Sequence, residues 1–208
     1  MTERVVLIHG LWMHGAAMLP LGWRVSRCGF DVKHFSYRSV MRSLEENAQQ
    51  LVSFLRAQDA GTLHVVGHSL GGLVALRALA MQNEPRVRRV VLMGSPVAGS
   101  AAGRGLARFR AGRWMLGRSL PLWSDPAVPA PPPGVEVGVI AGSLPFGLGR
   151  LFARLPTPND GVATLEEAQH PDAVDSIVLP VNHTGMLLSA RVAQQICTFL
   201  RDGRFGHD

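Results

Sequence analysis

Short apolar runs alternate along the chain with longer stretches in which apolar residues recur every three or four positions. The short runs are rich in β-branched residues, and most lack polar alternation, which is typical of strands covered on both faces. Strands are predicted at residues 5–8, 31–35, 63–66, 87–93, 135–141 and 176–179. Strands separated by helical stretches favour parallel pairing through helical crossovers, so the pattern predicts an α/β fold.

Three of the longer stretches have the signature of a helix. Ser43-Leu44-Glu45-Glu46 is a capping box, and apolar residues follow it at helical spacing as far as Leu55. Two further helices are predicted at residues 70–81 and 190–200. A chain of 208 residues has the usual length of one α/β domain, so we expect residues 1–208 to form a single domain.

The segment at residues 99–133 departs from this alternation. It is rich in Gly, Arg and Pro, ends in a proline cluster, and is long for a connection within a compact domain. Insertions of this kind are usually lids or linkers. Arginines interleave with large apolar residues over 104–116, which favours a cationic amphipathic helix. A solvated surface loop with scattered apolar residues is the alternative.

Composition and charge narrow the class of protein. The chain is 47% hydrophobic and 17% charged, which is enough apolar material for a large core. Its net charge of +6 could suggest nucleic acid or an anionic membrane surface. However, Lys33 is the only lysine among 21 basic residues, and Ala, Gly and Pro are abundant, which suggests genomic base composition instead. We therefore expect no nucleic-acid partner.

The cysteines and the apolar runs bear on compartment and metal binding. Cys28 and Cys197 are too few for a disulfide framework, and no Cys/His cluster indicates a metal, so we expect two reduced thiols and no metal site. The apolar run at residues 5–8 is too short for a signal peptide, and no run is long enough to span a membrane. A cytoplasmic location is expected.

The strongest chemical signal is Gly67-His68-Ser69-Leu70-Gly71-Gly72, directly after the strand at 63–66 and before the helix at 70–81. A G-x-S-x-G turn needs glycines on either side of the serine because the backbone bends sharply between strand and helix. The serine hydroxyl is then exposed at the helix N-terminus. A tight turn with a solvated serine is the alternative, but it leaves the matches described next unexplained.

With the turn His9-Gly10-Leu11-Trp12 after the first strand, this motif resembles the α/β-hydrolase family, in its branch of small bacterial lipases and esterases. The resemblance extends to His183 and implies a mainly parallel sheet with helices on both faces. It also implies that the N–H groups of Leu11 and Leu70 form an oxyanion hole, where one donor is worth about 3 to 4 kcal/mol. His9 and His68 are expected to pack or form hydrogen bonds rather than transfer protons.

A serine nucleophile needs a base, and the base needs a carboxylate to orient it. Family order places the base at His183, on the loop after the last strand, with His170 as the second choice. The carboxylate is expected at Asp160, in a stretch that resembles the NDG segment of many small lipases. Asp172 and Asp175 are rivals because they lie closer to His183 in the sequence.

A further resemblance concerns substrate class. Residues 94–100, with the sequence GSPVAGS, are similar to the G-T-P-H-x-G-S segment of triacylglycerol-lipase-like hydrolases, with departures at Ser95 and Val97. A strand that simply ends in a proline turn is the alternative. The fold often inserts a lid where residues 99–133 lie, and its basic face is suited to anionic lipid. The apolar side chains expected to line the acyl pocket are Trp12, Phe109, Trp114, Met115, Leu116 and Trp123.

These residues indicate a serine hydrolase that cleaves small-molecule or lipid esters through Ser69, His183 and Asp160 and an acyl-enzyme intermediate. No metal or organic cofactor is expected, because side chains and backbone supply every element of this chemistry. A thioesterase or amidase that uses the same triad is the nearest alternative. A non-catalytic ligand-binding member of the fold is the alternative from another class.

Overall fold

The computed structural model describes residues 3–123 and 128–207, and its centre is a parallel sheet with strand order β2-β1-β3-β4-β5-β6. The strands are β1 (Glu3–Ile8), β2 (Asp31–Phe35), β3 (Thr62–His68), β4 (Val87–Met93), β5 (Glu136–Gly142) and β6 (Asp175–Leu179). Each predicted strand is confirmed, and its ends lie within two residues of the predicted ones.

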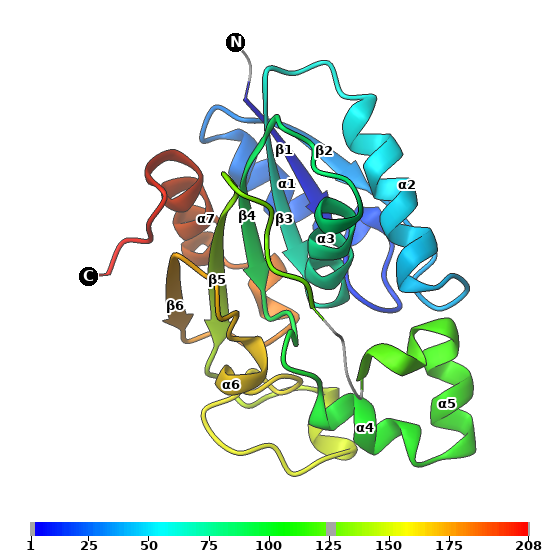
Figure 1. The fold of residues 1–208 in the computed structure, drawn as a ribbon. Coiled ribbons are helices and arrows are strands. Elements are labelled where there is room, and N and C mark those ends of the chain that lie inside the picture. The colour runs from blue at the N-terminus through cyan, green and yellow to red at the C-terminus, as the bar shows by residue number, and fades with distance from the viewer. Residues whose placement is uncertain (1–2, 124–127, 208) are drawn as a thin grey trace.

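Helices cover both faces of the sheet (Figure 1). Helices α2 (Leu44–Arg56) and α3 (Leu70–Met81) pack on one face, and α1 (Leu19–Ser26) and α7 (Ala190–Asp202) pack on the other. In β1, Val6 and Ile8 contribute to the first core and Val5 and Leu7 to the second, and all four are fully buried. A strand buried on both faces must be apolar throughout, which confirms the α/β prediction.

Three of these helices agree with the sequence pattern. The capping box of α2 is formed, since the Glu46 N–H donates to Ser43 Oγ and the Ser43 N–H donates to the Glu46 carboxylate. Helices α3 and α7 begin at the predicted residues. Helix α1 and the short α6 (Leu165–Ala168) were not predicted, although α1 has Pro20 in its first turn and buries Leu21 and Val25.

The Gly/Arg/Pro-rich segment lies at the edge of the sheet where the strands end (Figure 1). It forms α4 (Ala101–Ala107), α5 (Arg110–Leu116) and a 3₁₀ helix (Gly117–Trp123), and residues 124–127 lie outside the described part. The prediction of one helix over 104–116 is wrong, because Phe109 has an extended backbone (φ −96°, ψ 142°) that separates α4 from α5.

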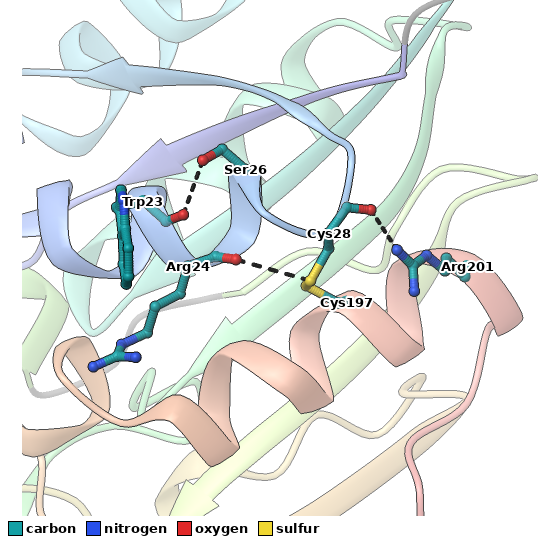
Figure 2. Close-up of a disulfide and its surroundings, with 6 residues drawn as sticks. All are labelled: Trp23, Arg24, Ser26, Cys28, Cys197 and Arg201. Atoms are coloured by element: carbon teal, nitrogen blue, oxygen red, sulfur yellow. Dashed lines mark hydrogen bonds between the residues drawn. A yellow bond between two sulfur atoms is a disulfide. The ribbon is translucent and has the colours of Figure 1, made fainter.

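Cys28 and Cys197 form a disulfide (Figure 2), so the expectation of two reduced thiols is wrong. Cys28 follows α1, Cys197 lies within α7, and the two helices pack side by side. Their Cα atoms are 6.3 Å apart, within the span of about 4.4 to 6.8 Å that a disulfide bridges. The Arg201 guanidinium also donates to the Cys28 carbonyl. A separation of 169 residues hides this pairing in the sequence.

Replacement of both cysteines by serine is expected to lower the free energy of unfolding by about 4 to 5 kcal/mol, because the bond closes a loop of 169 residues in the unfolded chain. Urea unfolding of the Cys28→Ser/Cys197→Ser variant measures the loss. Wild type unfolded in dithiothreitol is the control and should match the variant. Equal stability of wild type with and without reductant would show that the bond contributes nothing.

In the described residues, no helix combines the length and the apolar character needed to cross a membrane.

Candidate active site

Ser69 lies between the end of β3 and the start of α3. Its backbone has φ 53° and ψ −122°, a conformation that non-glycine residues rarely adopt. Such strain is typical of a nucleophile elbow, where the turn presents a serine side chain at the C-terminal edge of the sheet. The residue is 6% exposed and lines a cavity there.

The glycines on either side of Ser69 allow this turn to pack closely. A Cβ atom on Gly67 would lie 2.5 Å from the backbone N of Gly72, and one on Gly71 would lie 2.5 Å from the carbonyl O of Ile8. A Cβ on Gly72 itself would overlap the hydroxyl of Ser95. Side chains at these positions would therefore push α3 away from β1 and β3, which is the steric reason expected for the motif.

His183 and Asp160 come from two loops at the same edge of the sheet and contact each other directly. His183 Nδ1 lies 2.7 Å from Asp160 Oδ2, and the His183 backbone N–H donates to the Asp160 carbonyl at 2.9 Å. Both side chains are buried. The second oxygen, Asp160 Oδ1, accepts the N–H groups of Val162 (2.9 Å) and Ala163 (2.7 Å), so the carboxylate has a fixed orientation.

These contacts keep Asp160 ionised. Burial alone would raise its pKa, but the charge and hydrogen bond of His183 and the N–H groups of Ala163 and Val162 outweigh burial. The pKa of Asp160 therefore lies below its ordinary value, and the side chain is a carboxylate at neutral pH. A carboxylate that accepts from Nδ1–H leaves Nε2 of His183 free to accept a proton.

The rival residues from the sequence lie elsewhere. Asp175 is at the start of β6, where its carboxylate accepts from the Phe205 N–H and contacts His207 Nε2 at 2.9 Å. Asp172 is exposed on a loop, and its N–H donates to His170 Nδ1 at 3.1 Å. His170 is thus engaged with this loop. The structure brings Asp160, and neither rival carboxylate, against His183.

Ser69 and His183 both line an apolar cavity of about 180 Å³. Its wall includes Leu11 and Trp12 from the turn after β1 and Leu106, Leu116 and Trp123 from the 99–123 region. The loop after β5 contributes Leu148 and Phe152. Ser69 and His183 therefore face a space that is closed mainly by apolar side chains.

Phe109, Trp114 and Met115 were expected to line this cavity and lie outside it, with 59%, 83% and 41% of their surface exposed. The physical reason is how α5 packs. A Cβ atom on Gly112 would overlap the Leu106 carbonyl, so α5 contacts α4 through Gly112 and buries Leu116. The larger side chains are consequently on the exposed part of the helix.

Of the two residues expected to supply N–H groups to an oxyanion, Leu70 follows Ser69 in the chain and Leu11 lines the same cavity as Ser69. Leu70 is the first residue of α3, so its N–H has no carbonyl of the preceding turn to bind. Leu11 lies on the turn after β1, at the wall of the same cavity. A Cβ atom on the neighbouring Gly10 would lie 3.0 Å from Ser69 Cβ, which shows how closely this turn approaches the serine.

His9 fixes the turn after β1. Its Nδ1–H donates to the Gly10 carbonyl at 2.8 Å, and its Nε2 accepts the Tyr37 N–H at 3.2 Å. The Tyr37 hydroxyl donates to the His9 carbonyl at 3.0 Å. Burial lowers the pKa of His9, so the ring is neutral and can make both bonds. His9 thus fixes the backbone of the turn that carries Leu11.

His68 connects the Ser69 turn with the His183 loop. Its Nε2–H donates to the His183 carbonyl at 3.0 Å, and the two rings lie 4.7 Å apart. Burial lowers the pKa of His68 to about 3, so the ring stays neutral and does not compete for protons. Sequence reasoning assigned His68 a packing or hydrogen-bonding part but gave no partner.

Two glycines were missed as part of the site. Gly94, after β4, has φ 55°, and a Cβ atom there would lie 2.9 Å from Asp160 Oδ2 and 3.0 Å from His183 Nδ1. A Cβ on Gly142, the last residue of β5, would lie 2.8 Å from Asp160 Cβ. Both glycines make room for the His183–Asp160 pair. Their position at the ends of β4 and β5 is the only sequence signal for this.

In the described part of the chain, no group of three or more His, Cys, Asp or Glu side chains is placed to hold a metal ion.

Comparison with solved structures finds the same fold. Bacillus licheniformis lipase BlEst2 in its mature form superposes with a TM-score of 0.77 at 18% identity, over 96% of this chain and 91% of that one. The metagenomic carboxyl esterase MGS0156 gives 0.69 at 19%, over 87% and 64%. Bacillus subtilis carboxylesterase CesB gives 0.61 at 14%, over 96% and 84%. At these identities the likeness shows the fold alone.

No curated protein matches the chain by sequence. A family model does match, that of the alpha/beta hydrolase family, and it covers residues 5–201. This range includes the turn after β1, Ser69, Asp160 and His183. The chain belongs to the alpha/beta hydrolase family.

Proposed function

We propose that the protein is a serine hydrolase that cleaves carboxylic esters, with Ser69 as nucleophile, His183 as base and Asp160 as the carboxylate that orients His183. One observation carries the proposal: a strained serine turn and a buried His–Asp pair share one apolar cavity. The fold hosts several chemistries, so this site, rather than the fold, supports the function. The similar structures of a lipase and two carboxylesterases agree with it.

In the first half of the reaction, His183 Nε2 takes the Ser69 hydroxyl proton while Oγ bonds to the ester carbonyl carbon. The carbonyl π electrons move to the oxygen, and the N–H groups of Leu11 and Leu70 donate to this oxyanion. When the carbonyl re-forms, the C–O bond to the alcohol breaks. The alcohol leaves with the proton from His183, and the acyl group stays on Ser69.

In the second half, His183 takes a proton from water, and the water oxygen bonds to the acyl carbon through a second oxyanion. Collapse of this oxyanion breaks the bond to Ser69 Oγ, which recovers the proton from His183. The acid is released. The Asp160 carboxylate stabilises the imidazolium that forms in both halves, since it accepts from Nδ1–H at 2.7 Å.

The cavity favours a short acyl group. Its volume of about 180 Å³ is below the roughly 300 to 1,000 Å³ of sites that enclose drug-sized ligands. Its wall is mainly apolar, so an uncharged acyl chain is preferred over a polar one. Leu106, Leu116 and Trp123 contribute apolar side chains to this wall.

Residues 99–133 are proposed to act as a lid within a single domain of residues 1–208. The support comes from residues 99–123 of the described part, which contribute Leu106, Leu116 and Trp123 to the cavity. Trp12 Nε1–H donates to the Met115 carbonyl at 2.9 Å and so joins α5 to the turn that carries Leu11. Closure of this region would exclude water from the acyl-enzyme.

Hydrolysis of nitrophenyl esters from acetate to palmitate tests this function. We expect the highest kcat/KM at short chains and a fall at long ones, because the cavity cannot enclose a long chain. A Leu116→Ala variant is expected to move the optimum to longer chains, since it enlarges the cavity. Absence of turnover with every ester, in folded protein, would instead favour a non-catalytic ligand-binding protein, and preference for thioesters or amides would favour the alternatives on the same triad.

A cytoplasmic location stays a prediction, and the disulfide is the observation against it. Disulfides persist in oxidising compartments and are rare where thiols are kept reduced. Acid trapping and thiol alkylation of the protein in its native cells would decide: two alkylated cysteines agree with a reducing compartment, and none agrees with an oxidising one.

A further inference from the structure

Large apolar side chains are exposed on two segments beside the cavity. The first is α5 with Phe109, and the second is the loop after β5. Trp114 is 83% exposed and Phe146 is 77% exposed, and the others are more than half exposed. We call this set the cavity rim: Phe109, Trp114, Phe146, Leu148 and Leu151.

The two segments belong to one edge of the molecule. Leu116 of α5 and Leu148 of the loop line the same cavity. A Cβ atom on Gly105 of α4 would overlap the Phe152 carbonyl, so α4 and this loop are in contact. Figure 1 shows α4, α5 and the loop at the edge where the strands end, away from the N-terminus. The cavity rim therefore lies beside the site, on the same edge of the molecule.

The charge around the cavity rim is positive. Arg104 is 3.8 Å from Glu167 and Arg118 is 2.9 Å from Glu46. In the part of the chain that the structure describes, five other arginines on or next to the two segments have no carboxylate within ion-pair distance: Arg108, Arg110, Arg113, Arg150 and Arg154. All five are exposed.

This combination fits an anionic bilayer better than other partners. Exposed Trp, Phe and Leu side chains insert at the boundary between headgroups and acyl chains, and arginines beside them bind the phosphates. A nucleic acid would match the charge but would leave Leu148, Leu151 and Phe146 in water. Monomeric proteins rarely expose such a cluster unless it binds a surface or a partner.

We propose that the cavity rim docks on membranes that contain anionic phospholipid, with the cavity mouth toward the lipid. The proposal goes beyond ester hydrolysis, because docking needs neither Ser69 nor turnover. It concerns the surface on which the protein binds its ester substrate. Binding to that surface can be measured on a variant without hydrolase activity.

The test is sedimentation of the Ser69→Ala protein with vesicles of phosphatidylcholine, with or without about one third phosphatidylglycerol. Binding only to the anionic vesicles, reversed by high salt, is expected. Each arginine at an anionic surface contributes about fivefold, so Arg108→Gln/Arg110→Gln should weaken binding about 25-fold. Trp114→Ala should weaken it about tenfold, which corresponds to loss of one buried apolar side chain.

The chain supplies a matched control. Trp23 on α1 is 57% exposed, and the guanidinium groups of Arg24 and Arg27 lie 5.7 Å and 5.1 Å from its ring. It has the same chemistry in a different place, so Trp23→Ala should leave vesicle binding unchanged. Equal loss in both tryptophan variants would overturn the proposal. So would equal binding to both vesicle types, retention on DNA without vesicle binding, or a dimer that Trp114→Ala dissociates in the absence of vesicle binding.

Discussion

Replacement of Ser69 by alanine is expected to lower kcat for ester hydrolysis by about a million-fold, as loss of the nucleophile does in Ser-His-Asp enzymes. The variant keeps the cavity, the backbone N–H groups of Leu11 and Leu70, and the His183–Asp160 pair. Only the oxygen that forms the acyl-enzyme is lost. Steady-state kinetics with the preferred nitrophenyl ester measures the effect.

Ser53→Ala is the matched control for this variant. Ser53 is exposed on α2, away from the cavity, and its hydroxyl donates to the Gln49 carbonyl one turn earlier. We expect wild-type kcat and KM in this variant, and a thermal midpoint within a few degrees of wild type in both. Turnover by Ser69→Ala within tenfold of wild type would remove Ser69 from the mechanism.

Replacement of Asp160 by asparagine is expected to lower kcat by about ten thousand-fold with little change in the fold. The amide oxygen can still accept the N–H groups of Val162 and Ala163, which turns the NH₂ group toward His183 Nδ1. Nδ1 must then act as an acceptor, and the proton moves to Nε2. In this tautomer His183 cannot take the Ser69 proton.

The rival carboxylate supplies the control. Asp172 is exposed and does not contact His183, so Asp172→Asn should keep wild-type kcat. A large loss in Asp172→Asn together with a small loss in Asp160→Asn would mean that the loops rearrange when substrate binds. That pair of results would show that Asp172, and not Asp160, orients His183.

The sheet and the serine turn could be predicted because their signals are local. Most strands contain a continuous apolar run, although β2 carries Asp31, Lys33 and His34, and the glycines of the serine turn are within three residues of Ser69. The bend between β3 and α3 is set by these neighbours, so no distant contact was needed to expect it. The same holds for α2, whose capping box lies in four consecutive residues.

Features that depend on packing between distant segments were not predictable. Cys28 and Cys197 meet because α1 and α7 share one face of the sheet, and helix α1 itself was missed. The orientation of α5 follows from a close contact of Gly112 with Leu106, whereas the sequence pattern draws attention to Trp114. A glycine has no apolar side chain, so the hydrophobic pattern of the sequence does not show that it lies on the buried face of a helix.

The space around the His183–Asp160 pair was not predictable for the same reason. Gly94 directly follows β4 and Gly142 ends β5, and the His183–Asp160 pair itself comes from two further loops. Only the completed sheet brings the four together. Family order was therefore the basis for naming Asp160, and the hydrogen bond of 2.7 Å to His183 is the structural observation that supports it.

Labelling with a fluorophosphonate tests directly whether Ser69 is an activated nucleophile. Attack by an activated serine Oγ on phosphorus expels fluoride and leaves a stable phosphonyl adduct, and the adduct needs no knowledge of the natural ester. Peptide mass spectrometry locates it, which matters because Ser100 lines the same cavity. We expect one adduct on Ser69 in wild type and none in Ser69→Ala. An adduct on Ser100, or unlabelled wild-type protein that is folded, would contradict it.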